Sequence, residues 1–221
     1  MTSKVRAFAR AALWALPVWA AMLFFGTLTH QPDPQTDFAN FAAYVTTGQF
    51  LFSHLVNSIL GAAIGSIGVV ALLLYLQDTR VVGRAITGMV GTVMGNTLTS
   101  AVFGAAAFAQ PAAGQAFLAG QPNAQEFYNR VYGVPLFGTA MVSLLLFIIG
   151  GIFTGLAIAA SGRFPRWAGW VYAVAAAGFV LIGVPIPIGQ SVMSALLFVA
   201  AVAVAWSAGR GEVRVQSMSG V

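Results

Sequence analysis

The sequence predicts an all-α integral membrane protein: a helical bundle of about six transmembrane helices in one domain over residues 1–221, with short amphipathic helices on its outer side. The first observation is composition, because 59% apolar residues, 7% charged residues and a mean hydropathy of +0.86 lie outside the range of soluble domains. The second is two long stretches without a charged residue, 131–162 and 167–209. The third is that basic residues cluster between apolar runs, as in SGRFPRWAGW at 161–170.

Six apolar runs have the length that a membrane crossing requires, since a hydrocarbon core of roughly 30 Å needs about 20 helical residues. The runs cover residues 11–29, 50–77, 85–109, 134–160, 168–187 and 190–208. The first run ends in FFGTLTHQPD without a small-x-small cleavage pattern, so we interpret it as a retained anchor rather than a signal peptide. The last two runs are separated by GVPIPIGQS, whose two prolines favour a tight outer turn over a break in one re-entrant element.

The distribution of positive charge predicts the orientation. In a six-span arrangement, only Arg130 falls on one side of the membrane, and the other basic residues fall on the opposite side. These are Lys4, Arg6, Arg10, Arg80, Arg84, Arg163, Arg166, Arg210 and Arg214. The positive-inside rule therefore predicts cytoplasmic N- and C-termini and a location in the cell (inner) membrane. Because topology accounts for the basic residues, the pI of about 10.3 is no argument for a nucleic-acid partner.

Two outer connections predict short amphipathic helices. In DPQTDFANFAAYVTTGQ (33–49), the expected helix cap is Thr36 or Asp37. The apolar residues of this segment recur at helical spacing on one face, formed by Phe38, Phe41, Ala42 and Val45. In QPNAQEFYNRVYG (121–133), Asn123 is the expected cap, and Phe127 and Val131 the expected apolar face. Both helices are expected to cover the outer mouth of the bundle.

Small residues are expected to form the helix contacts, because burying leucine against leucine gains little over burying it against lipid. Span two has a stripe with steps of three and four residues, formed by His54, Ser58, Gly61, Gly65, Gly68 and Leu72. Spans three and four are also rich in glycine. We therefore expect spans two, three and four to pack closely against one another.

Four polar side chains in these spans are candidates for ligand binding: Asn57, Asn96, Thr99 and Ser143. An amide at the middle of a bilayer must find a partner, so Asn96 is the strongest single candidate. One interpretation is that the four side chains line a polar cavity between spans two, three and four. The other is that they only hold the helices together, with serine and threonine bonding back to carbonyls of their own helix.

The sequence excludes several kinds of chemistry and leaves one metal hypothesis. No predicted span contains Asp, Glu, Lys or Arg, so the usual carboxylate ion sites and proton relays are not expected. The chain has no cysteine, so thiolate metal sites are not expected. It has no catalytic motif, which favours a protein that is not an enzyme but leaves an enzyme as a third hypothesis that a bound metal or pigment would support. His30 and His54 fall on the outer side, where three carboxylates could complete a metal site. The alternative is that His30 lies at the interface and His54 is hydrogen-bonded in the bundle.

The stretch FIIGGIFTGLAIAASGRFPRWAGWVYAVAAAG (147–178) resembles a group of bacterial multi-span membrane proteins of no assigned activity. In those proteins an apolar span ends in S-G-x-x-P-R-x-x-G and another span follows. The segment FLFSHLVNSILGAAIGSIGVVALL (50–73) is similar to the corresponding helix of such proteins, and the resemblance covers roughly half of the chain. It implies a six-span helical bundle and assigns no catalytic residue.

Two functional hypotheses follow. The first is that the protein binds or transports a small or lipid-like solute in a cavity between spans two, three and four. The second is that it is a non-catalytic accessory or scaffold subunit, whose glycine stripes and apolar faces dock a larger membrane complex. The expected partners are membrane lipids, together with other membrane protein subunits or a second copy of the chain, and the sequence specifies no cofactor.

Overall fold

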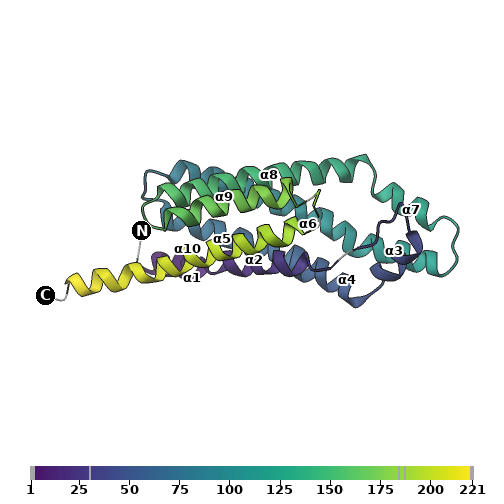
Figure 1. Ribbon diagram of the computed structural model, residues 1–221, viewed down its shortest axis with the longest axis horizontal. Coiled ribbons are helices and arrows are strands. Elements are labelled where there is room, and N and C mark those ends of the chain that lie inside the picture. Colours follow the sequence, from purple (N-terminus) through teal and green to yellow (C-terminus); the bar gives the residue numbers. More distant parts are fainter. Residues whose placement is uncertain (1–2, 30, 184, 187, 220–221) are drawn as a thin grey trace.

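The computed structural model describes residues 3–29, 31–183, 185–186 and 188–219, and within that part of the chain every regular element is a helix (Figure 1). The elements are α1 (Ser3–Ala12), α2 (Ala15–Gly26), α3 (Phe38–Val45), α4 (Gly48–Phe52), the π-helical segment η1 (Ser53–Leu60), α5 (Gly61–Leu76), α6 (Val82–Leu118), α7 (Ala124–Val131), α8 (Val134–Ala160), α9 (Arg166–Leu181) and α10 (Gly189–Ser219). The prediction of an all-α protein is therefore confirmed for the described residues.

Four helical segments are long and apolar enough to cross a membrane: Lys4–Gly26, Gly48–Leu76, Val134–Ala160 and Gly189–Arg210. They correspond to predicted spans one, two, four and six. The expected span 85–109 lies inside α6, whose many glycine, alanine and threonine residues make it less apolar than the four segments. The expected span 168–187 corresponds to α9, which is apolar but has only 16 residues and ends at Leu181. The structure thus supports a membrane-embedded bundle with four clear spanning helices.

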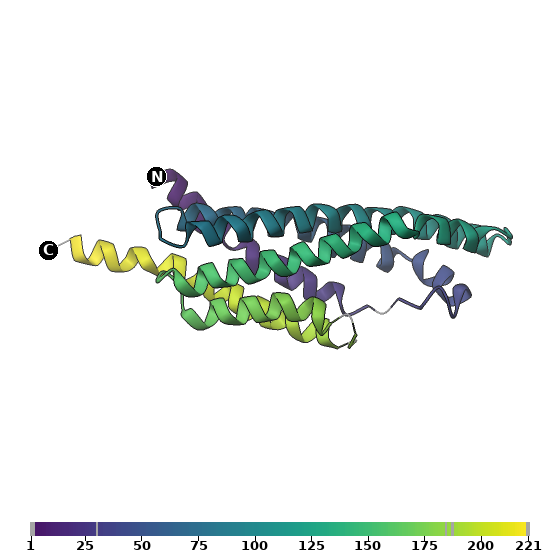
Figure 2. The same ribbon diagram turned by 90° about the horizontal axis from the view of Figure 1, so that it is seen from above.

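The long helices pack as a closed ring. Along the ring, α6 contacts α8, α8 contacts α9, α9 contacts α10, α10 contacts α2, α2 contacts α5, and α5 contacts α6 again. Figure 2 shows these helices running side by side along the length of the molecule. Helices that are far apart in the sequence close the ring, because α2 packs between α5 and α10.

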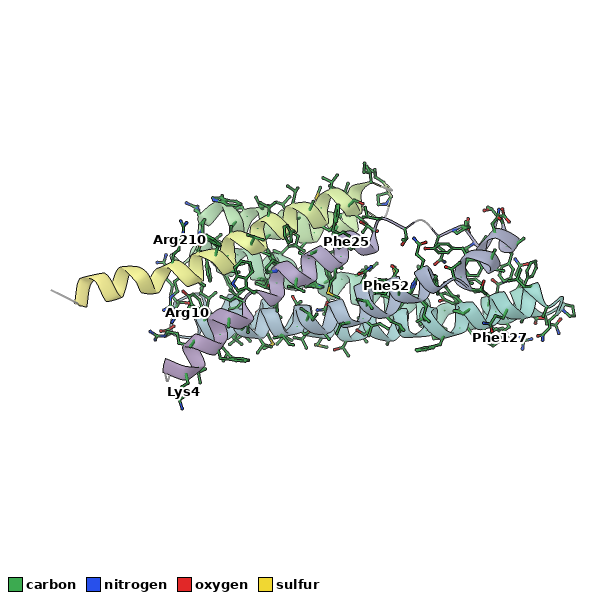
Figure 3. All side chains as sticks on the ribbon, turned by 90° about the horizontal axis from the view of Figure 1, so that it is seen from below. Lys4, Arg10, Phe25, Phe52, Phe127 and Arg210 are labelled. Carbon is green, nitrogen blue, oxygen red and sulfur yellow. The ribbon has the colours of Figure 1, made fainter. Side chains whose placement is uncertain are left out.

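Basic residues gather at one end of the ring, which we call the basic end. The α5–α6 loop meets the α8–α9 loop there, because Asp78 forms an ion pair of 3.0 Å with Arg163. Arg6 of α1 lies 4.0 Å from the same carboxylate. Figure 3 shows Lys4, Arg10 and Arg210 at this end. Lys4, Arg6, Arg10, Arg163 and Arg210, which the sequence predicted on one side of the membrane, therefore lie at the same end of the bundle.

Glycine residues let α6 and α8 approach to backbone contact. A Cβ atom added to Gly91 would lie 2.9 Å from the Cα atom of Gly150, and one added to Gly88 would lie 2.7 Å from the backbone nitrogen of Thr154. The close packing of spans three and four is thus as expected. The stripe on span two has a different partner, because Gly65 faces the Trp19 ring of α2 rather than spans three or four. Contacts among small residues in lipid thus define the ring.

At the end opposite the basic end, α6 continues past the ring and joins three short helices, forming what we call the aromatic head (Figures 1 and 2). With 37 residues at 1.5 Å each, α6 is about 55 Å long, against a hydrocarbon core of roughly 30 Å. The head comprises α3, α4, α7 and α6 from Gln110 onward. Its buried cluster consists of Phe38, Phe41, Val45, Phe50, Ala113 and Tyr128.

Both predicted amphipathic helices are present in the head. Asp37 caps α3 by accepting a hydrogen bond of 3.1 Å from the backbone N–H of Asn40, and all four residues of the predicted apolar face of α3 are buried. In α7 the predicted face is wrong, because Ala124 and Tyr128 are buried whereas Phe127 is 47% exposed. The reason is that α7 turns Tyr128 toward Phe41 in the aromatic cluster, so that the neighbouring Phe127 points away from it.

Candidate functional site

A cavity of about 310 Å³ lies inside the ring, on the side of the aromatic head. Every helix of the ring contributes to its lining, and Tyr44 of the head lines it as well. The interior toward the basic end is filled by fully buried side chains that include Leu16, Leu72, Ile158 and Tyr172. The cavity therefore ends at a packed core in one direction and at the aromatic head in the other. Its volume lies at the lower end of the range of small-molecule sites.

The structure brings most of the predicted site residues together around this cavity. Asn57, Asn96, Thr99 and His54 all line it. Ser143 does not line it but lies directly behind Thr99, with 2.5 Å between the two hydroxyl oxygens. The predicted metal ligand His30 lies outside the described residues. The sequence predicted a cavity between spans two, three and four. In the structure, α2, α9 and α10, which correspond to predicted spans one, five and six, also form part of its wall.

Four polar lining residues come from the π-helical segment η1: Ser53, His54, Asn57 and Ser58. The Ser58 hydroxyl donates to the Ser53 carbonyl five residues earlier. π-helical turns are rare and occur often at functional sites. The spacing of residues in the sequence did not reveal the π-helical segment, because residues three and four positions apart also share a face in an ordinary α-helix.

His54 offers one ring nitrogen to the cavity. Its Nδ1 atom lies 3.0 Å from the carbonyl oxygen of Phe50, and a carbonyl accepts only, so Nδ1 carries the proton and donates. The ring packs against Phe50 at 4.0 Å between centroids and against the edge of Phe103 at 5.4 Å. Among the described residues Nε2 has no hydrogen-bond partner, so in the neutral ring it is a free acceptor.

Asn96 holds two helices together and retains an acceptor. Its Nδ2 atom donates to the Ala62 carbonyl at 2.9 Å and lies 3.3 Å from the Ser66 hydroxyl, so α6 is tied to α5. The residue is only 3% exposed. No described residue donates to its Oδ1 atom. The two interpretations of Asn96 are therefore compatible, because its nitrogen serves the helix contact and its oxygen is left for the cavity.

Thr99 and Ser143 form a directed pair. The Ser143 hydroxyl donates to the Gly95 carbonyl at 3.2 Å, which uses its single proton. Thr99 must therefore donate in the 2.5 Å contact between the two hydroxyls. The remaining lone pairs of Thr99 make it an acceptor for a group in the cavity.

The polar side of the cavity is thus rich in acceptors and carries no formal charge. His54 Nε2, Asn96 Oδ1 and Thr99 Oγ1 can each accept a hydrogen bond. Asn57 is half-buried, and among the described residues its amide has no hydrogen-bond partner, so it supplies both a donor and an acceptor. Among the described residues that line the cavity there is no Asp, Glu, Lys or Arg. Such a surface matches a neutral molecule that carries several hydrogen-bond donors.

Part of the cavity lining is aromatic. The Trp19 and Phe147 rings lie 5.8 Å apart between centroids, and Phe147 lies 5.8 Å from Phe179. All three residues line the cavity, and they come from α2, α8 and α9. Sequence reasoning missed them, because aromatic residues in apolar spans face lipid at least as often as a cavity. Their presence adds an apolar surface for the carbon skeleton of a bound molecule.

The described residues contain no group of three His, Cys, Asp or Glu side chains that could hold a metal ion. His54 alone supplies one nitrogen ligand, which is fewer than a zinc site requires. A metal site that includes His30 stays a prediction, since that residue lies outside the described part of the chain.

Searches for related proteins, against family models, curated proteins and solved structures, gave no match for this chain.

Proposed function

We propose that this protein binds a small, uncharged solute with several hydrogen-bond donors in the cavity inside the ring. The observation that carries the proposal is the pairing of an acceptor-rich side, with His54, Asn57 and Thr99, and an aromatic side, with Trp19 and Phe147, in one cavity. A buried hydrogen-bonding group without a partner costs free energy, so an occupant that donates to these acceptors is stabilised. The aromatic side favours a molecule with an apolar face.

We further propose that the protein crosses the inner membrane six times, with α6 and α9 as spans three and five. The basic end then lies on the cytoplasmic side by the positive-inside rule, and the aromatic head lies outside. In this orientation the solute reaches the cavity from the outer side. Transport would in addition require the packed core around Leu72 and Tyr172 to open toward the basic end.

The six-span arrangement is tested with single cysteines, which is direct because the natural chain has none. Thr79→Cys and Gln121→Cys flank α6 and are expected to be labelled by a membrane-impermeant maleimide from opposite sides. Ser161→Cys and Ile186→Cys flank α9 and are likewise expected on opposite sides. Labelling of either pair from one side would remove the corresponding helix from the set of spans.

Solute binding is tested by native mass spectrometry of the full chain released gently from its membrane. A retained molecule of defined mass is expected, and Asn57→Leu and Thr99→Val are expected to remove it. Thr97→Val is the matched control, because Thr97 is exposed and its hydroxyl donates to the Val93 carbonyl of its own helix. Loss of the retained molecule in both threonine variants, or retention in all variants, would contradict the proposed site.

The same spectrum tests the accessory-subunit hypothesis. A stoichiometric complex with another protein, together with a cavity that retains no small molecule, would favour that hypothesis over solute binding.

A further inference from the structure

A second hollow, of about 620 Å³, lies at the basic end between the α5–α6 loop and the start of α9. Three arginines line it: Arg80 from the loop, Arg84 from the first turn of α6, and Arg166 from the first turn of α9. Phe164 and Trp170 contribute apolar surface to the same hollow. Three arginines, two of them four residues apart and the third from the start of another helix, thus line one hollow together with aromatic residues.

The positive charge of this hollow is not compensated by the described residues. No acidic side chain lines the hollow, and Arg80, Arg84 and Arg166 form no ion pair in the described part of the chain. The acid nearest in sequence, Asp78, is paired with Arg163 at 3.0 Å and lies 4.0 Å from Arg6.

Arg163 is fixed in turn by its contacts with Tyr75. It donates to the Tyr75 carbonyl, and its guanidinium lies 5.5 Å from the centre of the Tyr75 ring. A hydrogen bond from its own backbone N–H, and then the Arg163 charge, hold the pKa of Asp78 below its ordinary value. The Asp78 carboxylate is therefore engaged outside the hollow, and the three lining arginines remain available to an external anion.

We propose that this hollow binds the phosphate ester group of an anionic phospholipid, independently of the solute cavity at the other end. Guanidinium groups match phosphate oxygens in charge and in hydrogen-bond geometry. The positive end of the α9 helix dipole adds to the attraction, because Arg166 is its first residue. Trp170 lies one turn further into α9, where tryptophan is favoured at the level of lipid headgroups. Basic pockets between membrane helices are suited to such headgroups.

The hollow differs from the general positive charge of the basic end, and this difference makes the proposal testable. The hollow variant carries Arg80→Gln, Arg84→Gln and Arg166→Gln. The control variant removes the same charge from the same end outside the hollow, through Lys4→Gln, Arg6→Gln and Arg210→Gln. Binding of phosphatidylglycerol to the full-length protein is measured in a neutral detergent by native mass spectrometry, with phosphatidylcholine as the reference lipid.

The wild-type protein is expected to prefer phosphatidylglycerol over phosphatidylcholine by on the order of tenfold or more. The hollow variant is expected to lose this preference, and the control variant to keep it within about twofold. Equal losses in the two variants would overturn the proposal, since they would show diffuse attraction to the whole basic end. Equal binding of the two lipids by the wild type would overturn it as well.

Inorganic phosphate distinguishes the two sources of the phosphate group. Failure of millimolar phosphate to displace phosphatidylglycerol supports a lipid site. Displacement that depends on the three hollow arginines and not on the control residues supports a phosphate site and assigns it to a free phosphate compound. If the triple hollow variant does not purify as one species, the single changes Arg80→Gln and Arg6→Gln are compared in the same assay, because both residues are exposed and Arg80 lies in a loop.

Discussion

The membrane bundle and the aromatic head are held together by different residues, although α6 runs through both. In the bundle, α6 meets α8 through Gly88, Gly91 and Gly95, and backbone atoms of the two helices are in contact. In the head, the same helix meets its neighbours through large rings: Phe117 lies 5.0 Å from Phe38 between centroids. Small residues make the contacts of α6 with α8 in the bundle, whereas the head combines aromatic rings with one further close approach, at Gly114, where an added Cβ atom would lie 2.9 Å from the Ala42 carbonyl oxygen.

The surroundings of each region explain this difference. In lipid, an apolar side chain gains little by leaving acyl chains for a protein interior, so close backbone packing and interhelical hydrogen bonds drive association. In water, burial of apolar area is itself the driving force, and aromatic rings supply the most area for each residue. If α6 crosses the membrane as proposed above, it is expected to leave the bilayer between Gly95, its last glycine contact with α8, and Gln110, where the head begins.

The largest expected effect comes from filling a glycine contact in the bundle. Gly91→Leu is expected to lower the free energy of unfolding by more than about 3 kcal/mol, because its Cβ atom would meet the backbone of Gly150 at 2.9 Å. The matched control is Gly104→Leu on the same helix, where an added Cβ atom meets nothing within 4 Å and the expected change is about 0.5 kcal/mol or less. Thermal unfolding in detergent measures both, and equal effects would show that the α6–α8 contact does not determine the fold.

Removal of a ring from the head is expected to act locally. Phe41 is fully buried, so Phe41→Ala is expected to cost about 3 kcal/mol, but only within the head. Hydrogen exchange of α3 and α7 should become faster while exchange of α8 stays unchanged. Phe108→Ala is the control on α6, since Phe108 is 67% exposed. Faster exchange throughout the bundle would mean that the head and the ring unfold as one unit.

Much of this architecture could be predicted from the sequence wherever a local pattern determines the structure. The predicted range 134–160 matches α8, and the spacing of Phe38, Phe41 and Val45 identified the buried face of α3. Both could be predicted because each depends only on the apolar pattern within one helix. The four polar candidates also lie close together, because Asn57, Asn96 and Thr99 line the cavity and Ser143 lies behind Thr99.

The parts that were missed depend on contacts between distant segments. The sequence predicted that span three ends at residue 109, and a proline normally ends a helix. α6 nevertheless continues through Pro111 to Leu118, because Ala113 and Phe117 pack into the head. The contact between Gly65 and Trp19 was missed for the same kind of reason, since a glycine stripe does not specify which helix lies against it.

Replacing a buried amide side chain is expected to have a smaller effect on stability. Asn96 in the bundle and Gln110 in the head are expected to differ in the size of this effect. Asn96→Leu is expected to lower the free energy of unfolding by about 1 kcal/mol, because it removes the bond to the Ala62 carbonyl inside the bundle. Gln110 in the head donates to the Tyr132 hydroxyl at 2.6 Å, but its own Oε1 atom is buried without a partner in the described structure. Gln110→Leu also removes that unmet acceptor, so its expected cost is smaller than that of Asn96→Leu. Thermal unfolding of the two variants under identical conditions checks the order, and a larger loss for Gln110→Leu would contradict it.

The last test uses pH, because the stacked tyrosines Tyr128 and Tyr132 both pack in the head. Burial raises the pKa of Tyr132 and that of Tyr128 above the ordinary value of about 10. A tyrosine whose pKa is raised by folding stabilises the folded state fully below that ordinary value, and this contribution is lost as the pH rises through the folded-state pKa. Cleavage within residues 31–47 by a protease that stays active in alkali should therefore increase above about pH 10.

Tyr132→Phe separates the hydroxyl from the ring. At neutral pH the variant lacks the hydrogen bond from Gln110, which costs about 1 kcal/mol. The rate at which the head is cleaved at neutral pH is therefore expected to be higher than in the wild type. Its further increase above pH 10 should be smaller, since one ionisable group with a raised pKa is gone. A wild-type head that resists cleavage equally at pH 8 and pH 11 would mean that neither tyrosine ionisation weakens it, and the stacked pair at 4.5 Å between ring centroids would then be held by area burial alone.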